Sequence, residues 1–248
     1  MKAALTLAAL VTATAASAEI VGQDHDYTVD GTDFRGYVAT NTDLAEPLGT
    51  VLIVHDWDGL TDYEKRRAEM LAELGYTAFA IDVYGTDADP QGMEDYRRLS
   101  GELYADRETF RARLMGSIAE ASNVQGATEN MVIQGYCFGG AAVLEAARAG
   151  ADLDGFISFH GGLDLPEGQD YSGVQGPIML FHGSADPVSG MDALGTLLTD
   201  LQEAGVSHGA EVFGGARHSF TVYGSQDYDL DADRKSWSGL QQFLTETL

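Results

Sequence analysis

Short apolar runs alternate with amphipathic stretches along this chain. Continuous apolar runs such as 51–54 are typical of strands buried on both faces. The pattern predicts strands at 27–29, 34–39, 51–54, 78–83, 131–133, 155–159, 177–181 and 210–213, and helical segments at 62–74, 93–122, 141–148 and 232–247. Alternating strands and helices favour a mostly parallel sheet covered by helices on both faces. We therefore predict one doubly wound α/β domain.

Turn and cap residues refine this pattern. The turn Asp30-Gly31-Thr32 predicts an opening hairpin, and Gly75 is a plausible C-terminal cap for the first helix. The segment 93–122 is polar and charged with one apolar face, so a solvated helical face is favoured, and part of a lid is the alternative.

The first eighteen residues have the features of a signal peptide. Lys2 is followed by an apolar stretch at 3–16, and Ala16-Ser17-Ala18 fits a cleavage site. The stretch is too short for a membrane span, and no later one is long and apolar enough. We predict an exported, periplasmic protein with its single domain at 19–248, and a frayed or amphipathic N-terminal helix is the alternative.

The composition of the chain excludes several classes of binding partner and of site. The chain has 248 residues with 39 acidic and 14 basic side chains, for a net charge of −25. This charge argues against nucleic acid and against anionic lipid surfaces, because both attract basic proteins. Hydrophobic residues make up 44% of the chain, which is enough for a sizeable core. The single cysteine, Cys137, excludes an internal disulfide and a Cys-rich zinc site.

The strongest local motif surrounds Cys137. Gly135-x-Cys137-x-Gly139-Gly140 lies between a predicted strand and a predicted helix, which is the form of a nucleophile elbow with Cys in place of Ser. The elbow would place the thiol at a helix N-terminus, where the helix dipole is expected to lower its pKa from about 8.5. A buried structural cysteine beside a Gly-rich turn is the alternative.

The order of residues in elbow enzymes is nucleophile, acid, histidine. His218 follows the last predicted strand at the carboxyl edge of the sheet, so we predict it as the general base. Asp186, held in a turn by Pro187, is the predicted acid, and the alternatives are a simple turn role or a different acid, Asp164 or Asp192. Roles in satisfying loop backbone groups, or on the surface, are expected of His160, His182 and His208.

An oxyanion hole needs two N–H donors. The backbone of Phe138, directly after the nucleophile, supplies one, and the loop after strand 51–54 supplies the other. We assign the second donor to Trp57, with Asp56 N–H as the alternative. Trp57 is also a candidate apolar wall.

Five segments, 51–60, 80–85, 135–140, 182–187 and 218–220, together resemble the dienelactone hydrolase family of the α/β-hydrolase fold. The resemblance implies a triad of Cys137, His218 and Asp186. It also implies that Asp56, where the family usually has Glu, touches the resting thiol and helps to switch it to the reactive state.

Two departures from the family concern the substrate. Dienelactone hydrolase holds its substrate's carboxylate with two arginines, and this chain has Thr86 and Val222 at those positions. Arg217 is a candidate substitute. Together with the negative charge, these departures favour neutral substrates.

The sequence therefore predicts a hydrolase that cleaves a small ester or lactone through a cysteine acyl-enzyme. Because a thiolate leaves more easily than an alkoxide, we expect a preference for good leaving groups, as in aryl esters and enol lactones. A non-catalytic small-ligand-binding protein is the alternative. A redox role is disfavoured because no resolving cysteine is present. No cofactor and no metal are predicted, and the sequence does not predict the oligomeric state.

Overall fold

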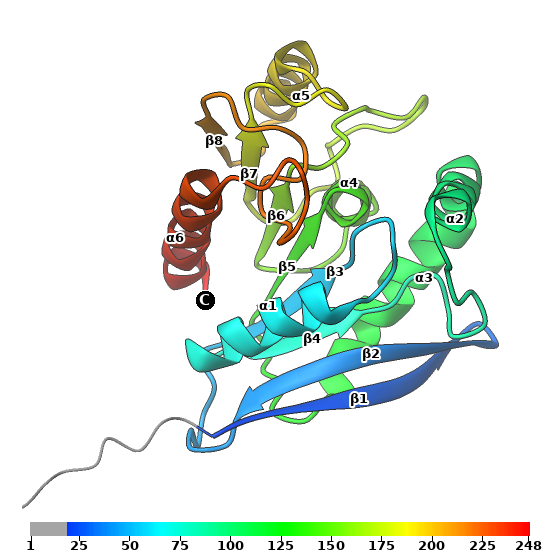
Figure 1. The fold of residues 1–248 in the computed structure, drawn as a ribbon, viewed down its shortest axis with the longest axis vertical. Helices are drawn as coiled ribbons and strands as arrows, with labels where there is room; N and C mark the ends of the chain where they lie inside the picture. The colour runs from blue at the N-terminus through cyan, green and yellow to red at the C-terminus, as the bar shows by residue number, and fades with distance from the viewer. Residues whose placement is uncertain (1–18) are drawn as a thin grey trace, which may run out of the picture.

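The computed structural model describes residues 19–248, so the predicted signal peptide at 1–18 lies outside the described residues. The described chain forms one eight-stranded sheet in the order β1-β2-β4-β3-β5-β6-β7-β8 (Figure 1). Its strands are β1 (Ile20–Val29), β2 (Thr32–Asn41), β3 (Thr50–Val54), β4 (Thr77–Ile81), β5 (Met131–Tyr136), β6 (Gly155–Phe159), β7 (Ile178–Gly183) and β8 (His208–Phe213).

Strand direction follows the length of the connections. The tight turn at Asp30 and Gly31, both with positive φ, joins β1 to β2 as an antiparallel hairpin. The sequence predicts this hairpin, but each strand is longer than its apolar core. β2 runs antiparallel to β4, and every later neighbour is parallel because a helix or a long loop carries the chain back.

Helices cover both faces of the sheet, which confirms the predicted α/β class. They are α1 (Asp62–Glu73), α2 (Met93–Ala105), α3 (Arg107–Glu120), α4 (Phe138–Arg148), α5 (Met191–Glu203) and α6 (Leu230–Thr247). Side chains of β3 alternate between two buried clusters. Leu52 and Val54 pack in the cluster that includes α2 to α5, and Val51 and Ile53 pack with α1 and α6.

Two details differ from the sequence prediction. The segment expected to be continuously helical at 93–122 breaks at Asp106, whose side chain accepts the Thr109 N–H and begins α3. Helix α5 is absent from the prediction, although its buried leucines recur at helical spacing: Leu194, Leu197 and Leu201. Gly195 lies in the middle of α5 and is a poor helix former, which weakens the helical signal of this segment.

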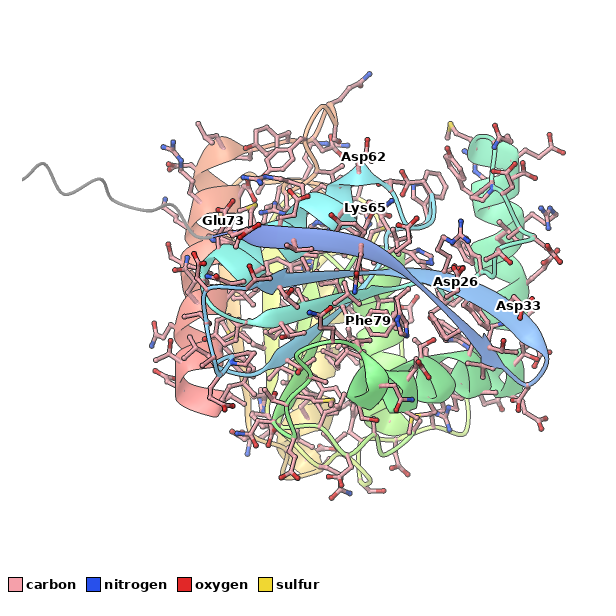
Figure 2. The ribbon with its side chains drawn as sticks, turned by 90° about the horizontal axis from the view of Figure 1, so that it is seen from below. Asp26, Asp33, Asp62, Lys65, Glu73 and Phe79 are labelled. Carbon is pink, nitrogen blue, oxygen red and sulfur yellow. The ribbon has the colours of Figure 1, made fainter. Side chains whose placement is uncertain are left out.

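Acidic side chains occupy much of the surface along the hairpin and α1. Figure 2 labels four of them, Asp26, Asp33, Asp62 and Glu73, around the buried Phe79 of β4. Lys65 provides a local counter-charge, with its Nζ 3.4 Å from Asp24. The negative charge is therefore carried largely by solvated groups, where it costs little desolvation.

Candidate active site

The turn between β5 and α4 has the geometry of a nucleophile elbow. Cys137 has φ 50° and ψ −108°, a strained conformation for a residue with a side chain. A Cβ on Gly135 would lie 2.2 Å from the Gly139 carbonyl oxygen, and one on Gly139 would lie 2.2 Å from the Val54 oxygen. Gly135 is therefore needed for the turn to close onto the first turn of α4, and Gly139 for α4 to pack against the end of β3.

The structure brings Cys137, His218 and Asp186 into contact. His218 Nε2 lies 3.0 Å from Cys137 Sγ, and His218 Nδ1 lies 2.8 Å from Asp186 Oδ2. The other carboxylate oxygen of Asp186 accepts backbone N–H groups from Val188 at 2.7 Å and Ser189 at 3.1 Å. The acid is thus fixed by its own loop and directed at one nitrogen of the histidine.

The pKa of the acid Asp186 and the pKa of the thiol Cys137 are shifted in opposite directions. Burial alone would raise the pKa of Asp186, but the hydrogen bond from His218 and the two loop N–H groups hold it below its ordinary value. Burial and the neighbouring Asp56 carboxylate raise the pKa of the Cys137 thiol well above its ordinary value. The predicted lowering is wrong for this state, because burial and nearby carboxylates outweigh the helix N-terminus.

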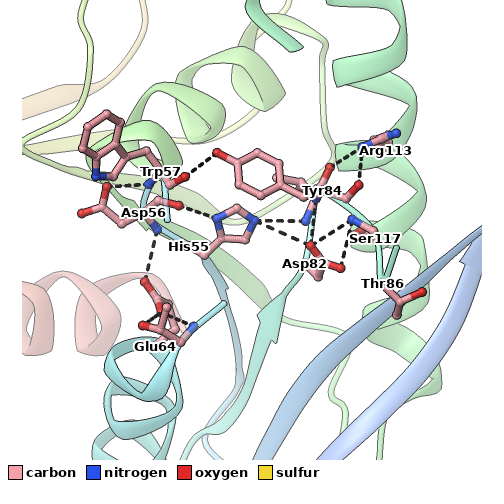
Figure 3. Close-up of polar contacts among 12 residues, drawn as sticks. His55, Asp56, Trp57, Glu64, Asp82, Tyr84, Thr86, Arg113 and Ser117 are labelled. Atoms are coloured by element: carbon pink, nitrogen blue, oxygen red, sulfur yellow. Dashed lines mark hydrogen bonds and ion pairs between the residues drawn. The ribbon is translucent and has the colours of Figure 1, made fainter. Parts of the chain in front are cut away.

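The loop after β3 brings a carboxylate to the thiol. Asp56 is buried beside Cys137, and the hydrogen bond between the two side chains contributes to the raised pKa of the thiol. The Trp57 N–H donates to Asp56 Oδ1 at 2.6 Å (Figure 3). One of the two predicted oxyanion donors is therefore engaged by the protein itself. The other, Phe138 N–H, faces the thiol sulfur.

Glu64 of α1 accepts two backbone hydrogen bonds from this loop. Its Oε1 accepts the Asp56 N–H at 3.2 Å, and its Oε2 accepts the Thr61 N–H at 2.9 Å (Figure 3). Burial raises the pKa of Asp56 to about 6 and that of Glu64 to about 8. Sequence reasoning missed Glu64, although Thr61-x-x-Glu64 is a capping-box signature.

His55 and Tyr84 join the same loop to the end of β4. His55 Nε2 accepts the Val83 N–H at 3.2 Å, and His55 Nδ1 bonds the Asp56 carbonyl oxygen (Figure 3). Tyr84 Oη donates to the Trp57 carbonyl oxygen at 2.9 Å. The ring of Trp57 packs against Tyr96 of α2, with centroids 5.7 Å apart. Trp57 is thus bonded through its backbone N–H and its carbonyl oxygen, while its ring packs on α2.

The remaining histidines bond neighbouring loops and side chains. His182 Nε2 bonds the Ser189 carbonyl oxygen at 2.8 Å, and His208 Nδ1 bonds that of Val206 at 2.8 Å, while His208 itself is partly buried. His160 bonds the backbone of Cys137 itself. The alternative acids Asp164 and Asp192 are exposed, and of the three candidate acids only Asp186 hydrogen-bonds His218.

Thr86 and Val222 stand where dienelactone hydrolase has its two substrate-binding arginines, and Arg217 is the candidate substitute for them. Thr86 Oγ1 donates to the Asp33 carbonyl oxygen at 3.2 Å, and Val222 is partly buried in the loop after His218. Arg217 is paired with Asp227 at 2.7 Å and is largely exposed. The structure therefore gives Arg217 a partner of its own on the surface.

Two further features are absent from residues 19–248. No helix there has the length and apolar content needed to cross a membrane. No cluster of three or more His, Cys, Asp or Glu side chains there is arranged to hold a metal ion.

Known proteins resemble this chain over most of its length. The profile of the dienelactone hydrolase family matches residues 34–248. The chain belongs to the dienelactone hydrolase family. A Saccharolobus solfataricus relative named for carboxymethylenebutenolidase activity is 23% identical, over 88% of this chain and 96% of its own length. A Bradyrhizobium relative named for 2-oxo-3-(5-oxofuran-2-ylidene)propanoate lactonase activity is 23% identical, over 81% of this chain and 87% of its own length.

Solved structures agree with the family and the fold. A dienelactone hydrolase-like promiscuous phosphotriesterase from metagenomic libraries superimposes with a TM-score of 0.82 at 29% identity, covering 92% of this chain and 98% of that one. The fold is that of the α/β hydrolases. The family and its named relatives make this protein a hydrolase of carboxylic esters or lactones, of the dienelactone hydrolase type.

Proposed function

We propose that the protein cleaves a small ester or lactone through a covalent acyl group on Cys137. The observation that carries this proposal is the row of contacts from Asp186 through His218 to the Cys137 sulfur, at 2.8 Å and 3.0 Å. A base oriented by an acid on one nitrogen and directed at a thiol with the other is the arrangement that nucleophilic catalysis requires.

Acylation begins with a proton transfer. His218 Nε2 takes the thiol proton, and the sulfur donates its electron pair to the substrate carbonyl carbon. The carbonyl oxygen becomes an oxyanion, which the N–H groups of Phe138 and Trp57 stabilise. Collapse of this intermediate expels the leaving oxygen, which receives the proton from His218. The acyl group remains on Cys137 as a thioester.

Deacylation reuses the same residues. His218 takes a proton from a water molecule, whose oxygen attacks the thioester carbon. The second tetrahedral intermediate expels the Cys137 sulfur and releases the acid product. The thiolate regains its proton from His218, so the site returns to its starting charge.

Asp56 controls the starting state in this proposal. Its carboxylate disfavours ionisation of the Cys137 thiol and accepts the Trp57 N–H at 2.6 Å. A substrate carbonyl that takes the place of the Asp56 carboxylate at the Trp57 N–H displaces that carboxylate. The negative charge of Asp56 then lies farther from the Cys137 sulfur. Binding and activation of the thiol are thereby coupled, and an ionised thiol is avoided before substrate arrives.

The preferred substrates are those with good leaving groups. In the first intermediate the thiolate and the oxygen compete to leave, so a phenolate or enolate is released more often than an ethoxide. The relative named for lactonase activity supports an enol lactone, and the relative described as a promiscuous phosphotriesterase supports adding an aryl phosphotriester to the substrate panel.

A panel assay tests the proposed substrates. The panel holds enol lactones and pairs of aryl and ethyl esters of the same acid, and Cys137→Ala is the control enzyme. We expect turnover of lactones and aryl esters by the wild type. Equal turnover of the matched aryl and ethyl esters would contradict the thiolate mechanism.

The main competing hypothesis is a small-ligand-binding protein on this fold. Iodoacetamide labelling separates the two, because a thiol next to His218 is alkylated faster than an isolated thiol of equally raised pKa. We expect His218→Gln to slow alkylation of Cys137. A rate independent of His218, together with no turnover on the panel, would favour the binding protein.

We also propose that residues 1–18 direct export and are then removed. The apolar stretch and the Ala16-Ser17-Ala18 site support this proposal. Mass spectrometry of the protein purified from a periplasmic extract should give a chain that starts at Glu19, and an intact Met1 would contradict it.

A further inference from the structure

His160 lies between the two halves of the proposed catalytic pair. We propose that it is a positioning residue: its imidazole joins the backbone of the nucleophile to Thr221 in the loop of His218, and so fixes the distance between Cys137 and His218. This inference rests on the proposed acyl-enzyme function and assigns His160 no contact with substrate.

The contacts of His160 reach both catalytic segments. Its Nδ1 accepts the Cys137 N–H at 3.2 Å, a hydrogen bond shared with the Phe159 carbonyl oxygen at 3.0 Å. Its Nε2 lies 2.8 Å from Thr221 Oγ1. Its ring meets that of His218 edge to face, with centroids 5.5 Å apart. A single fully buried side chain therefore contacts both the elbow and the histidine loop.

The geometry selects one tautomer of His160. An N–H donor faces Nδ1, so Nδ1 must be the unprotonated, accepting nitrogen. The ring proton is then on Nε2 and is donated to Thr221 Oγ1. Burial, together with the nearby charges of His218, Arg67 and His182, lowers the pKa of His160 well below its ordinary value. The imidazole stays neutral when His218 gains the proton of the thiol.

Backbone geometry also indicates that His160 is held in place. Its φ is 40°, in the left-handed region that few residues with side chains adopt. Its N–H donates to the Phe181 carbonyl oxygen at 2.8 Å, which fixes it to the end of β7. Such a conformation persists only where surrounding contacts determine it.

Thr221 is itself anchored from outside the site. Tyr63 Oη lies 2.7 Å from Thr221 Oγ1, and Arg67 donates to the Thr221 carbonyl oxygen at 3.0 Å. Arg67 is buried and paired with Asp233 of α6 at 2.5 Å. Helices α1 and α6 thus hold Thr221, and Thr221 holds His160.

This arrangement has a mechanical consequence. Cys137 and His218 belong to loops that follow different strands, β5 and β8, so their separation of 3.0 Å depends on how those loops are held together. Without the bond between His160 and Thr221, the two loops would keep their folds but lose a direct connection. A small increase in the distance between sulfur and nitrogen slows proton transfer and leaves substrate contacts unchanged.

The test uses Thr221 because it touches neither substrate nor the reacting atoms. Thr221→Val keeps the shape of the side chain but removes the acceptor for His160, and Thr221→Ser restores it. Thr50→Val is the matched control, since Thr50 is also buried and its hydroxyl bonds Thr128 Oγ1 at 3.0 Å and the Thr128 N–H at 2.8 Å. Thr50 lies at the opposite end of β3 from the catalytic loops.

The readouts are kcat and KM for an aryl ester, and the rate of iodoacetamide alkylation as a function of pH. For Thr221→Val we expect kcat to fall about tenfold while KM stays within about twofold of the wild-type value. The midpoint, which is the pH at which the alkylation rate is half its maximum, should move to higher pH. Thr221→Ser should regain most of the wild-type kcat. Thr50→Val should lower Tm but leave kcat and the midpoint at their wild-type values.

Three results would overturn the inference: wild-type kcat and midpoint in Thr221→Val, changes in Thr50→Val as large as those in Thr221→Val, or no recovery in Thr221→Ser. His160→Asn adds a second variant, since its Oδ1 can still accept the Cys137 N–H while the bond to Thr221 is lost, and it should behave as Thr221→Val does. If Cys137→Ala retains turnover, the proposed function fails instead.

Discussion

The Trp57 N–H donates to the Asp56 carboxylate at 2.6 Å, so a side chain of the protein occupies one of the two proposed oxyanion donors. The same carboxylate lies against the Cys137 thiol and, with burial, raises its pKa. One buried acid therefore restrains both the nucleophile and the group that would stabilise its transition state. A carbonyl that binds at Trp57 would relieve both restraints.

This arrangement predicts the effect of removing the charge of Asp56. In Asp56→Asn the thiol loses a neighbouring anion, so alkylation of Cys137 by iodoacetamide at pH 7 should accelerate, on the order of tenfold. The rate is measured by loss of free thiol. An alkylation rate equal to that of the wild type would show that Asp56 does not restrain the thiol.

The contact between Asp186 and His218 predicts a loss of turnover without a loss of binding. Asp186→Asn keeps the shape of the acid but can present its amide nitrogen to His218 Nδ1, which favours the wrong tautomer. We expect kcat for an aryl ester to fall by about ten-thousandfold while KM changes little. Steady-state kinetics measures both. A decrease of less than tenfold would remove Asp186 from the triad.

Burial of Glu64 predicts a pH dependence of stability. Its pKa rises from the ordinary 4.5 to about 8, so the folded protein binds this proton more tightly than the unfolded chain. The resulting stabilisation is fully present below pH 4.5 and is lost as the pH rises to about 8. Within this range, the free energy of unfolding should fall by about 1.4 kcal/mol for each rise of one pH unit.

Glu64→Gln tests this sign. The amide has no proton to lose, so the free energy of unfolding should decline less steeply between pH 5 and 8 than in the wild type, as measured by urea denaturation. The amide also fits the Asp56 N–H poorly, so the slope and not the absolute stability is the readout. Parallel curves for the two proteins would contradict the raised pKa.

The charge of the molecule predicts a preference between matched substrates. With −25 overall and with Thr86 and Val222 in place of two arginines, the site should turn over a neutral aryl ester with a higher kcat/KM than its carboxylate analogue. Added salt should raise kcat/KM for the anionic ester only, because it screens long-range repulsion. A higher kcat/KM for the anionic ester at low salt would point to an unrecognised cationic subsite.

Much of the fold could be predicted because a buried strand needs apolar residues at consecutive positions, which can be recognised in a short stretch of sequence. The runs at 51–54 and 155–159 are fully buried strands, and the close approach of Gly139 to β3 leaves a readable glycine motif. Cys137, His218 and Asp186 could be brought together for a similar reason. Parallel strands end at one edge of the sheet, so residues that follow different strands meet there.

Other features depend on side-chain directions that no local pattern encodes. The bond from Trp57 to Asp56 and the bond from Cys137 to His160 each join a backbone group to one rotamer of a neighbouring loop residue. The pKa of Cys137 depends on the balance between a helix N-terminus, burial and the Asp56 carboxylate. The motif indicates the helix N-terminus, and the family resemblance implies the contact with Asp56, but the degree of burial and the resulting balance do not follow from the sequence.

If Cys137 forms the covalent intermediate, the Cys137→Ala variant has no atom that can carry the acyl group, so its turnover should be lost. Hydrolysis of an aryl ester is compared with that of the wild type after far-UV circular dichroism has shown the same fold. We predict a fall in kcat of at least about a thousandfold, because neither His218 nor the oxyanion donors can replace the sulfur. Turnover by Cys137→Ala within tenfold of the wild type would show that no acyl group forms on this sulfur during the reaction.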